Sequence, residues 1–521
     1  MTTLPEPSGS DGGLLPPALS VTGLGHNTAW LYLNAGASVL GGLFLLGFSF
    51  RHLGASTYGV YALVATAFAV FGTVDFGLRL FVIRATARDS ESFAHDERRR
   101  ARRDVEAAHQ TYVLCGLFVL AASGITMVLV AIRQGGPFGG AQVPLLVLLV
   151  GLSVALNLGT ASFAGIPIGR RQFQVPAIGG LAGTGVKIAV VVTTIGHLKL
   201  VALGAGFLAG VLVSQGYCIW WVYRHEPWFR HIPRPVGWAE IRRVVSFAAP
   251  LLIISASGPA ISATDLVVVG AVATTAAAGL YRAGSIVPSQ ATAMLFSGYD
   301  TIYPHLAGTT DLKGQENATR FLTRVAAFVA GSTFAIVIVL RVDVVMAVIG
   351  HPSALAQSVL VVFCCVWLAN VPVHGLMLLL IARGRQGVFV WLVGVEAAAN
   401  LALSIIFALV LGPIGPAYAT LVALVASSLI VFPAIARHEF SKGIARKTLI
   451  EALAAIGVGG ASAVLAISPL LWLGAGWGRL LIGGALGSGI SCAVGLVLLR
   501  QHGRAILTSM LRGRTAAPTP R

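Results

Sequence analysis

Long apolar runs, separated by short polar connections, recur along the whole chain. Fourteen of these runs reach or approach the roughly 20 residues that an α-helix needs to cross the hydrocarbon core of a bilayer. They cover residues 27–50, 57–83, 111–132, 142–166, 174–195, 200–223, 246–271, 279–304, 321–340, 354–382, 387–411, 413–436, 448–472 and 479–499. The pattern predicts an all-α integral membrane protein with about fourteen transmembrane helices.

The composition favours the same class. Of the 521 residues, 56% are hydrophobic and 11% are charged, whereas a soluble domain carries roughly a quarter charged residues. A soluble fold of this length could not bury so much apolar surface, so lipid is the expected solvent. The five cysteines lie within or beside apolar runs without metal-ligand spacing, so we expect packing residues, no disulfides and no metal site.

The positive charges are distributed unevenly between the two sides of the predicted membrane. If the N-terminus is cytoplasmic, 28 of the 36 Lys and Arg residues lie in cytoplasmic segments, 5 lie outside and 3 lie within spans, counting Arg324 and Arg479 at the span ends with the adjoining connections. This asymmetry is typical of positive-inside topology in the inner (plasma) membrane, with both termini cytoplasmic. It also accounts for the net charge of +17, so we predict no nucleic-acid partner. Residues 1–25 contain no Lys or Arg, so we expect no cleaved signal peptide.

Two weak internal repeats divide the chain. "YGVYAL" at 58–63 matches "AGLYRA" at 278–283, and "GRRQF" at 169–173 matches "RGRQG" at 383–387. Their offsets, 220 and 214 residues, correspond to six spans, an even number, so the two halves have the same orientation. This predicts two six-helix bundles related by a pseudo-twofold axis along the membrane normal.

These repeats predict six segments. They are a disordered cytoplasmic tail (1–25), an N-terminal six-helix bundle (26–223), a cytoplasmic linker (224–245), a C-terminal six-helix bundle (246–437), two additional transmembrane helices (438–500) and a basic cytoplasmic tail (501–521). The longest connection, residues 84–110, mixes arginines with acidic residues and is expected to be a solvated amphipathic connector.

Three stretches resemble a known family. They are "RHLGASTYGVYALVATAFAVFGTVDFGLRLFVIR" at 51–84, "PLLIISASGPAISATDLVVVGAVATTAAAGLYRAGSIV" at 250–287 and "LGPIGPAYAT" at 411–420. They are similar to the polysaccharide transporter family, the O-antigen-type oligosaccharide flippases of the multidrug, oligosaccharidyl-lipid and polysaccharide exporter superfamily. The resemblance implies a flippase that moves polyprenyl-linked oligosaccharides to the outer leaflet. Its implied partners are that lipid-linked oligosaccharide, membrane lipids, a polysaccharide polymerase and glycosyltransferases.

Charged residues inside the spans are the candidate functional residues, because each costs a few kcal/mol at the bilayer centre unless it meets a partner or water. Lys187, near the middle of the fifth span, is a candidate anion site for the phosphate groups of a lipid-linked sugar. A lysine that snorkels or pairs with a carboxylate is the alternative. Asp75 and Arg79 are four residues apart and share a helix face. We expect a local ion pair, with contact between Arg79 and substrate as the alternative.

The second half contains four further candidates. Asp265 and Arg282 lie near the outer ends of spans 7 and 8, so we expect an ion pair that is either structural or an outer gate. Glu396 and Asn400 are four apart in span 11, and the half-to-half match suggests that Glu396 faces Lys187 across a central cavity. Glu396 could bind a coupling proton or sodium, and Asn400 substrate. His374 and Asn370 are expected to be core polar groups, and Tyr281 and Trp391 packing or interface residues.

Three other functions stay open. The chain contains no phosphate-binding Gly-rich loop with Lys-Ser/Thr and no large outer domain, so we predict neither an enzyme nor a cofactor. A drug antiporter would use Asp265 or Glu396 as its coupling carboxylate and would not need Lys187. A lipid II-type flippase would carry a different sugar in a cationic cavity. A membrane assembly factor without transport would have a closed, dry centre.

Overall fold

The described residues are almost entirely helical. The computed structural model describes residues 21–72, 75–91, 95–132, 142–229, 236–300, 312–383, 385, 387–436, 439–441 and 443–512, and no strand occurs among them. The helices of the first half are α1 (Val21–Gly72), α2 (Asp75–Glu91), α3 (His95–Ile132), α4 (Gln142–Gly159), α5 (Ser162–Gly169), α6 (Gln174–Leu198) and α7 (Leu200–His225). Those of the second half are α8 (Trp238–Val272), α9 (Thr275–Asp300), α11 (Leu312–Val339), α12 (Arg341–Ile349), α13 (Ala354–Ala382), α14 (Gly387–Leu411), α15 (Gly415–Val425), α16 (Phe432–Ala436), α17 (Ile444–Ile467) and α18 (Trp477–Arg512).

The predicted spans appear as helices. Ten helices within the described residues are long and apolar enough to cross a membrane, and two of these contain two predicted spans each. The first, Tyr32–Asp89, is broken at Gly54, whose φ of 77° is a left-handed value that glycine adopts without a Cβ clash. The second, Val390–Ala436, is broken at Gly412, with a φ of 69°. Predicted spans 7 and 8 lie in α8 and α9. The all-helical membrane fold is therefore confirmed.

The polar segments differ from the predictions. The expected solvated connector at 84–110 is wrong in part, because it extends α2 and α3 and buries Asp89, Val105 and Ala108. One face of this segment is apolar enough to pack against other helices. The many arginines on its other faces made the segment look solvated in the sequence. Helix α1 begins at Val21, within the predicted N-terminal tail, and α18 continues to Arg512, within the predicted C-terminal tail. Residues 1–20 and 513–521 lie outside the described residues.

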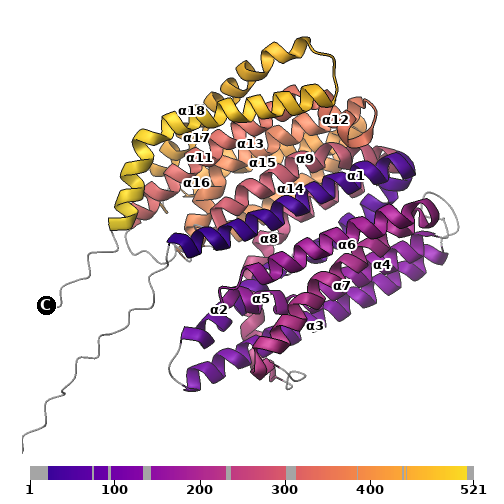
Figure 1. Ribbon diagram of the computed structural model, residues 1–521, viewed down its shortest axis with the longest axis vertical. Helices are drawn as coiled ribbons and strands as arrows, with labels where there is room; N and C mark the ends of the chain where they lie inside the picture. The colour runs from indigo at the N-terminus through magenta and orange to yellow at the C-terminus, as the bar shows by residue number, and fades with distance from the viewer. Residues whose placement is uncertain are drawn as a thin grey trace, which may run out of the picture.

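Two groups of helices lie side by side (Figure 1). Helices α2 to α7 form the first helix group, and α9 with α11 to α16 forms the second. Helices α1 and α8 run between the groups and contact both. Helices α17 and α18 pack on α11, at the outer edge of the second group. The elements that connect the groups are therefore α1 and α8, the first helix of each predicted bundle.

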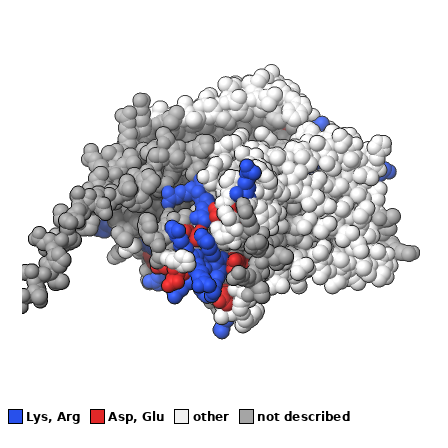
Figure 2. Space-filling view, turned by 60° about the horizontal axis from the view of Figure 1, so that its bottom comes forward, with Lys and Arg blue, Asp and Glu red and all other residues white. Residues whose placement is uncertain are grey.

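The two ends of the helices differ in charge. One end holds the last turns of α2, the start of α3 and the connection between α5 and α6, and we call it the arginine-rich end. There, Lys and Arg interleave with Asp and Glu (Figure 2). The opposite end, with Gly54, α12 and the start of α18, is the arginine-poor end. The charge asymmetry predicts that it faces outward.

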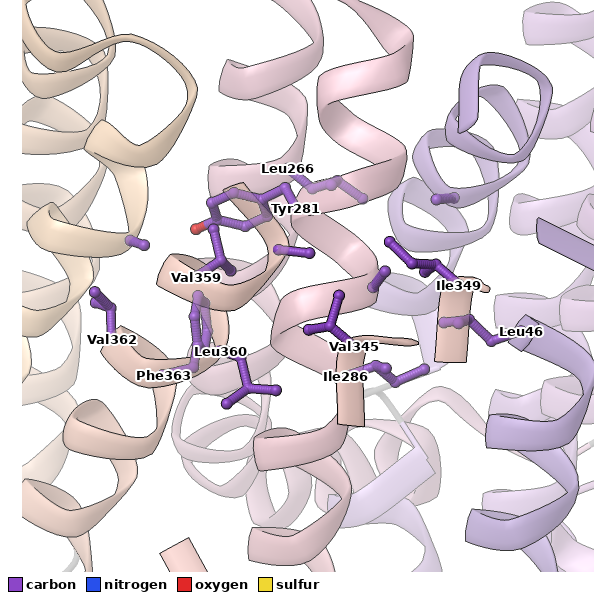
Figure 3. Packing of buried hydrophobic residues seen from close by; sticks show 14 of the residues in the cluster. Leu46, Leu266, Tyr281, Ile286, Val345, Ile349, Val359, Leu360, Val362 and Phe363 are labelled. Atoms are coloured by element: carbon purple, nitrogen blue, oxygen red, sulfur yellow. The ribbon is translucent and has the colours of Figure 1, made fainter. Parts of the chain in front are cut away.

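A hydrophobic cluster joins the two groups at the arginine-poor end. Its buried side chains come from α1, α6, α7, α8, α9, α11, α12, α13, α15 and α17. Figure 3 shows Leu46 of α1 and Ile349 of α12 on one side of the cluster, and Tyr281 of α9 with Phe363 of α13 on the other. Because this cluster includes both groups, separating them at this end would expose apolar surface.

The repeated Gly-Tyr motifs meet where α1 crosses α9. A Cβ built on Gly59 would lie 1.8 Å from the backbone oxygen of Thr275, and a Cβ built on Gly279 would lie 2.4 Å from that of Ala55. Gly59 and Gly279 are 220 residues apart, as are Ala55 and Thr275. A reciprocal contact between equivalent residues is what a twofold relation produces. This contact supports the predicted pseudo-twofold axis.

Candidate functional site

Asp265 lies at the centre of a fully buried polar cluster where α8, α9, α14 and α15 meet. Its Oδ1 accepts hydrogen bonds from Asn400 Nδ2 at 3.1 Å and from Ser404 Oγ at 2.8 Å. Its Oδ2 accepts from Thr420 Oγ1 at 2.5 Å and from the Tyr281 hydroxyl at 3.3 Å. The Asp265 side chain is 0% exposed. We call these five residues the Asp265 cluster.

The Asp265 cluster has one hydrogen-bond donor fewer than its acceptors require. The Thr420 hydroxyl is near two acceptors, Asp265 Oδ2 at 2.5 Å and Asn400 Oδ1 at 2.9 Å, and it has one hydrogen to donate. Whichever acceptor the hydroxyl donates to, its oxygen stays in contact with the other acceptor without a hydrogen between them. A proton on Asp265, or a cation between these oxygens, completes the network. The site therefore has the chemistry of a proton or small-cation site.

Arg282 does not pair with Asp265, so the expected ion pair is wrong. Consecutive residues on a helix point about 100° apart, and it is Tyr281 that faces Asp265. Arg282 instead acts electrostatically on the phenol groups of Tyr58 and Tyr61 in α1. Within the described residues it forms no ion pair. Arg282 is therefore placed beside the contact between α1 and α9.

Glu396 and Lys187 do not face one another. Glu396 of α14 forms a hydrogen bond with Ser427, in the π-helical segment Ala426–Val431. Helix α14 packs on α15 and α8, whereas α6, which carries Lys187, packs on α7 and α1. The half-to-half match placed the two residues at corresponding positions, but corresponding positions in two bundles need not be neighbours. Asn400 is part of the Asp265 cluster and is 0% exposed.

Lys187 lies on the face of α6 that packs against α7. A Cβ built on Gly210 would lie 3.0 Å from the Cβ of Lys187, so the missing side chain makes room for the lysine. The Lys187 Nζ lies 5.4 Å from the ring centroid of Phe207, in cation–π geometry. No carboxylate among the described residues lies within ion-pair distance. Lys187 is therefore half-buried, with the ring of Phe207 beside its ammonium group.

Asp75 and Arg79 form the expected local ion pair on α2. The fully buried Tyr112 of α3 donates a hydrogen bond of 2.7 Å to Asp75 Oδ1, so the carboxylate is held by two partners. The Arg79 side chain stays 41% accessible. A Cβ built on Gly165 of α5 would lie 3.9 Å from the Cγ of Arg79. Arg79 is therefore anchored by Asp75, with part of its guanidinium group accessible.

Comparison with known proteins identifies the family. The model of a family described as "Polysaccharide biosynthesis protein" matches residues 24–309, which is more than half of the chain. The chain belongs to this polysaccharide biosynthesis family. A comparison with curated protein sequences finds no match.

Solved structures similar to this polysaccharide biosynthesis family member are membrane transporters. The lipid II flippase MurJ, in an inward closed conformation, has a TM-score of 0.64 and 15% identity, covering 90% of this chain and 99% of MurJ. An inward-facing multidrug resistance transporter of the MATE family and the MOP superfamily has a TM-score of 0.60 and 11% identity, covering 82% and 96%. A MOP superfamily transporter from Pyrococcus furiosus has a TM-score of 0.55 and 12% identity, covering 80% and 96%. At these identities the likeness shows a transporter fold.

The family member also contains two buried arginine clamps that the sequence analysis missed. Arg170, after α5, binds Asp89 Oδ2 at 2.6 Å and Glu226 at 2.7 Å. Arg383, after α13, binds Glu316 at 3.3 Å and the backbone oxygen of Glu439 at 3.3 Å. Each arginine follows the fourth span of its half. The repeated sequences "GRRQF" and "RGRQG" were the available signal.

The remaining candidates lie in the packing between helices or at its surface. His374 stacks on Phe296 with ring centroids 3.6 Å apart, in the helix interior. Trp391 is 80% exposed, as for an interface residue. Tyr281 packs in the hydrophobic cluster and also donates to Asp265.

Proposed function

We propose that this protein is a flippase that moves a lipid-linked oligosaccharide across the inner membrane for surface polysaccharide biosynthesis. The family match over residues 24–309 carries this proposal, because it points to polysaccharide biosynthesis in a chain with a transporter fold. The cargo is a polyprenyl phosphate or pyrophosphate sugar. A polysaccharide polymerase and glycosyltransferases are the expected partners.

The packing supports alternating access. The hydrophobic cluster and the crossing of α1 with α9 join the two helix groups at the arginine-poor end, which by the positive-inside rule faces outward. The sugar headgroup therefore enters from the cytoplasm while the prenyl tail stays in lipid. Separation of the groups at the arginine-poor end would then open a central cavity, with the headgroup in it, toward the outside. In this scheme both termini are cytoplasmic.

The Asp265 cluster supplies the coupling site in this scheme. Its five residues come from four helices, including α8, which contacts both helix groups. A proton or sodium ion at Asp265 draws α14 and α15 onto α8, so its arrival or loss changes how the groups meet. Lys187 and Arg79 are the proposed contacts for the cargo phosphates. Glu396 and Asp75 position the residues around them. Arg282 lies at the proposed outer gate, where α1 crosses α9.

Flipping of a fluorescent lipid-linked oligosaccharide in proteoliposomes tests the proposal. Lys187→Glu should abolish flipping and Lys187→Arg should retain it, because the site needs a cation. Asp265→Asn should remove the dependence on sodium or pH. Unchanged flipping in Lys187→Glu would contradict the anion site. Transport of drugs, or of lipid II, in place of the oligosaccharide would favour the antiporter or lipid II alternatives. No transport of any of these cargoes would favour an assembly factor.

A further inference from the structure

A pocket of about 630 Å³ opens at the arginine-poor end, away from the Asp265 cluster and Lys187. Its walls include Arg51 and Gly54 of α1, Asp343 of α12, His351 after α12, and Trp477 at the start of α18. Helix α1 runs between the two helix groups, whereas α12 belongs to the second group and α18 packs on its outer edge. The size is within the range of small-molecule sites, which is about 300–1,000 Å³. The pocket therefore spans the seam between α1 and the second group.

The acidic residue of this pocket is already neutralised. Asp343 is fully buried and pairs with Arg479 at 2.7 Å. It also accepts a hydrogen bond of 2.7 Å from the backbone nitrogen of Gly476. The pair thus fixes the start of α18, including Trp477, against α12. It contributes structure to the pocket wall and no net charge.

Arg51 has no acidic partner among the residues that the structure describes. It is exposed, and one N–H of its guanidinium donates to the backbone oxygen of Ala347 at 2.8 Å. A guanidinium carries five N–H groups, so the others are open to the pocket. Cations are scarce on this side of the membrane, and positive-inside topology does not explain one here. A cation that lines a pocket at this end indicates an anionic ligand.

Two neighbours define the ligand further. His351 is exposed and lies beside Phe50, with ring centroids 6.2 Å apart. Its Nδ1 lies 3.3 Å from the backbone oxygen of Pro352, so Nε2 is the ring nitrogen left for a ligand. Trp477 is 60% exposed and offers an indole face. Arginine in a fork suits phosphate oxygens, and an aromatic face suits the apolar face of a sugar ring. Because tryptophan is also common at membrane surfaces, Trp477 is tested separately.

We propose that this pocket binds a sugar phosphate or sugar pyrophosphate headgroup at the arginine-poor end. The ligand joins Arg51 of α1 to His351 and Trp477 of the second group. Opening at this end would pull Arg51 away from Ala347 and divide the pocket. A ligand that binds the undivided pocket therefore stabilises the state in which the arginine-poor end is closed. Added from the outside, it should slow transport. This effect on transport rests on the proposed function, whereas the binding does not.

Binding is measured by titration calorimetry of the purified full-length protein with glucose 1-phosphate and with inorganic pyrophosphate. Arg51→Gln should weaken both about tenfold or more, as expected for loss of charge-assisted hydrogen bonds. Arg341→Gln is the matched control, because Arg341 is a cation at the same end whose side chain donates only a long bond of 3.4 Å to Ile338. Trp477→Ala should weaken glucose 1-phosphate but not pyrophosphate. Equal binding by the wild type and Arg51→Gln overturns the proposal.

Nanodiscs separate a soluble ligand from a lipid headgroup as the source of the phosphate. If glucose 1-phosphate binds in phosphatidylcholine discs but is displaced in phosphatidylglycerol discs, and both depend on Arg51, the pocket takes a lipid phosphate. If it binds equally in both, it takes a soluble headgroup. Flipping without any binding would overturn this inference and leave the proposed function standing. Binding by a protein that flips no cargo would support this inference and contradict the proposed function.

Discussion

At the scale of single residues, burial constrains the charge of Asp265. An ionised carboxylate that is removed from water without a counter-charge costs several kcal/mol. Asp265 has four neutral donors and, within the described residues, no basic partner. Its surroundings therefore favour either its neutral form or a bound cation, and each choice changes how tightly α8, α14 and α15 are held together.

The hydroxyl of Thr420 should matter more than that of Tyr281. Thr420→Val removes the oxygen between Asp265 and Asn400, and we expect the affinity for the coupling cation to fall about tenfold or more. Tyr281→Phe removes a longer contact of 3.3 Å and should change it by about threefold or less. The sodium dependence of the thermal unfolding temperature, at constant ionic strength, measures this affinity. Equal effects of the two variants would contradict the assignment.

Sequence reasoning identified Asp265 as a charge inside a span but not its partners. Ser404 and Thr420 are neutral hydroxyl residues, which are ordinary in membrane helices. Their approach to Asp265 depends on how α14 and α15 pack on α8, and a single sequence does not contain that information. The local pair of Asp75 with Arg79 was predictable, because helix geometry fixes residues four apart.

At the scale of helices, the crossing of α1 with α9 is tight enough that glycine is required. Gly59→Ala should cost about 1–3 kcal/mol of stability in the closed state, since its Cβ would lie 1.8 Å from the Thr275 oxygen. We expect the arginine-poor end to open more often. A cysteine in place of Thr275, which is 6% exposed at this crossing, should then react faster with a membrane-impermeant maleimide in a background without native cysteines.

Gly42→Ala is the matched control for this crossing. Gly42 is also on α1, and a Cβ there would meet nothing within 4 Å. Alanine is the better helix former, by about 1 kcal/mol, so this variant should be neutral or stabilising. If both variants changed the reactivity equally, a general softening of α1 would be responsible and the crossing would not be the seal.

The arginine clamp at Arg170 should contribute strongly to stability. Arg170→Gln leaves Glu226 without a cation and Asp89 with one ion pair instead of two, and Asp89 is 2% exposed. Removal of one partner of a buried pair costs about 3–5 kcal/mol. Arg243→Gln breaks an exposed pair with Asp104 and should cost about 0–1 kcal/mol. Thermal unfolding in detergent compares the two, and equal losses would refute the buried clamp.

The helices themselves were predictable, and their ends were not. Apolar runs of sufficient length give the spans directly, as in α6 and α7. The extension of α2 and α3 beyond the apolar region was not predicted, because Asp89 and Val105 become buried only through packing of the first helix group. Hydropathy identifies segments that partition into lipid. It does not identify residues that become buried against other helices outside the hydrocarbon core.

At the scale of the whole molecule, the twofold relation places the repeated motifs at the seam between the groups. Ser56 Oγ lies 2.9 Å from Thr275 Oγ1, next to the crossing of α1 with α9. Cysteines at both positions should form a disulfide that holds the arginine-poor end closed. Flipping should stop on oxidation and return with a reductant, whereas each single cysteine should leave flipping unchanged. Continued flipping in the cross-linked protein would contradict alternating access through this seam.

The direction of transport depends on which end faces the cytoplasm. Because 28 of 36 Lys and Arg residues belong to one set of predicted connections, moving them outward would reverse the charge preference that orients membrane proteins. We expect a cysteine at position 351, at the arginine-poor end, to react with an impermeant maleimide in intact cells. A cysteine at position 100, in the arginine-rich start of α3, should react only after lysis. The opposite result would keep the fold, the Asp265 cluster and the Arg51 pocket, but it would place the closed seam on the cytoplasmic side. Cargo would then enter this conformation from outside, which a cytoplasmically assembled lipid-linked sugar cannot do.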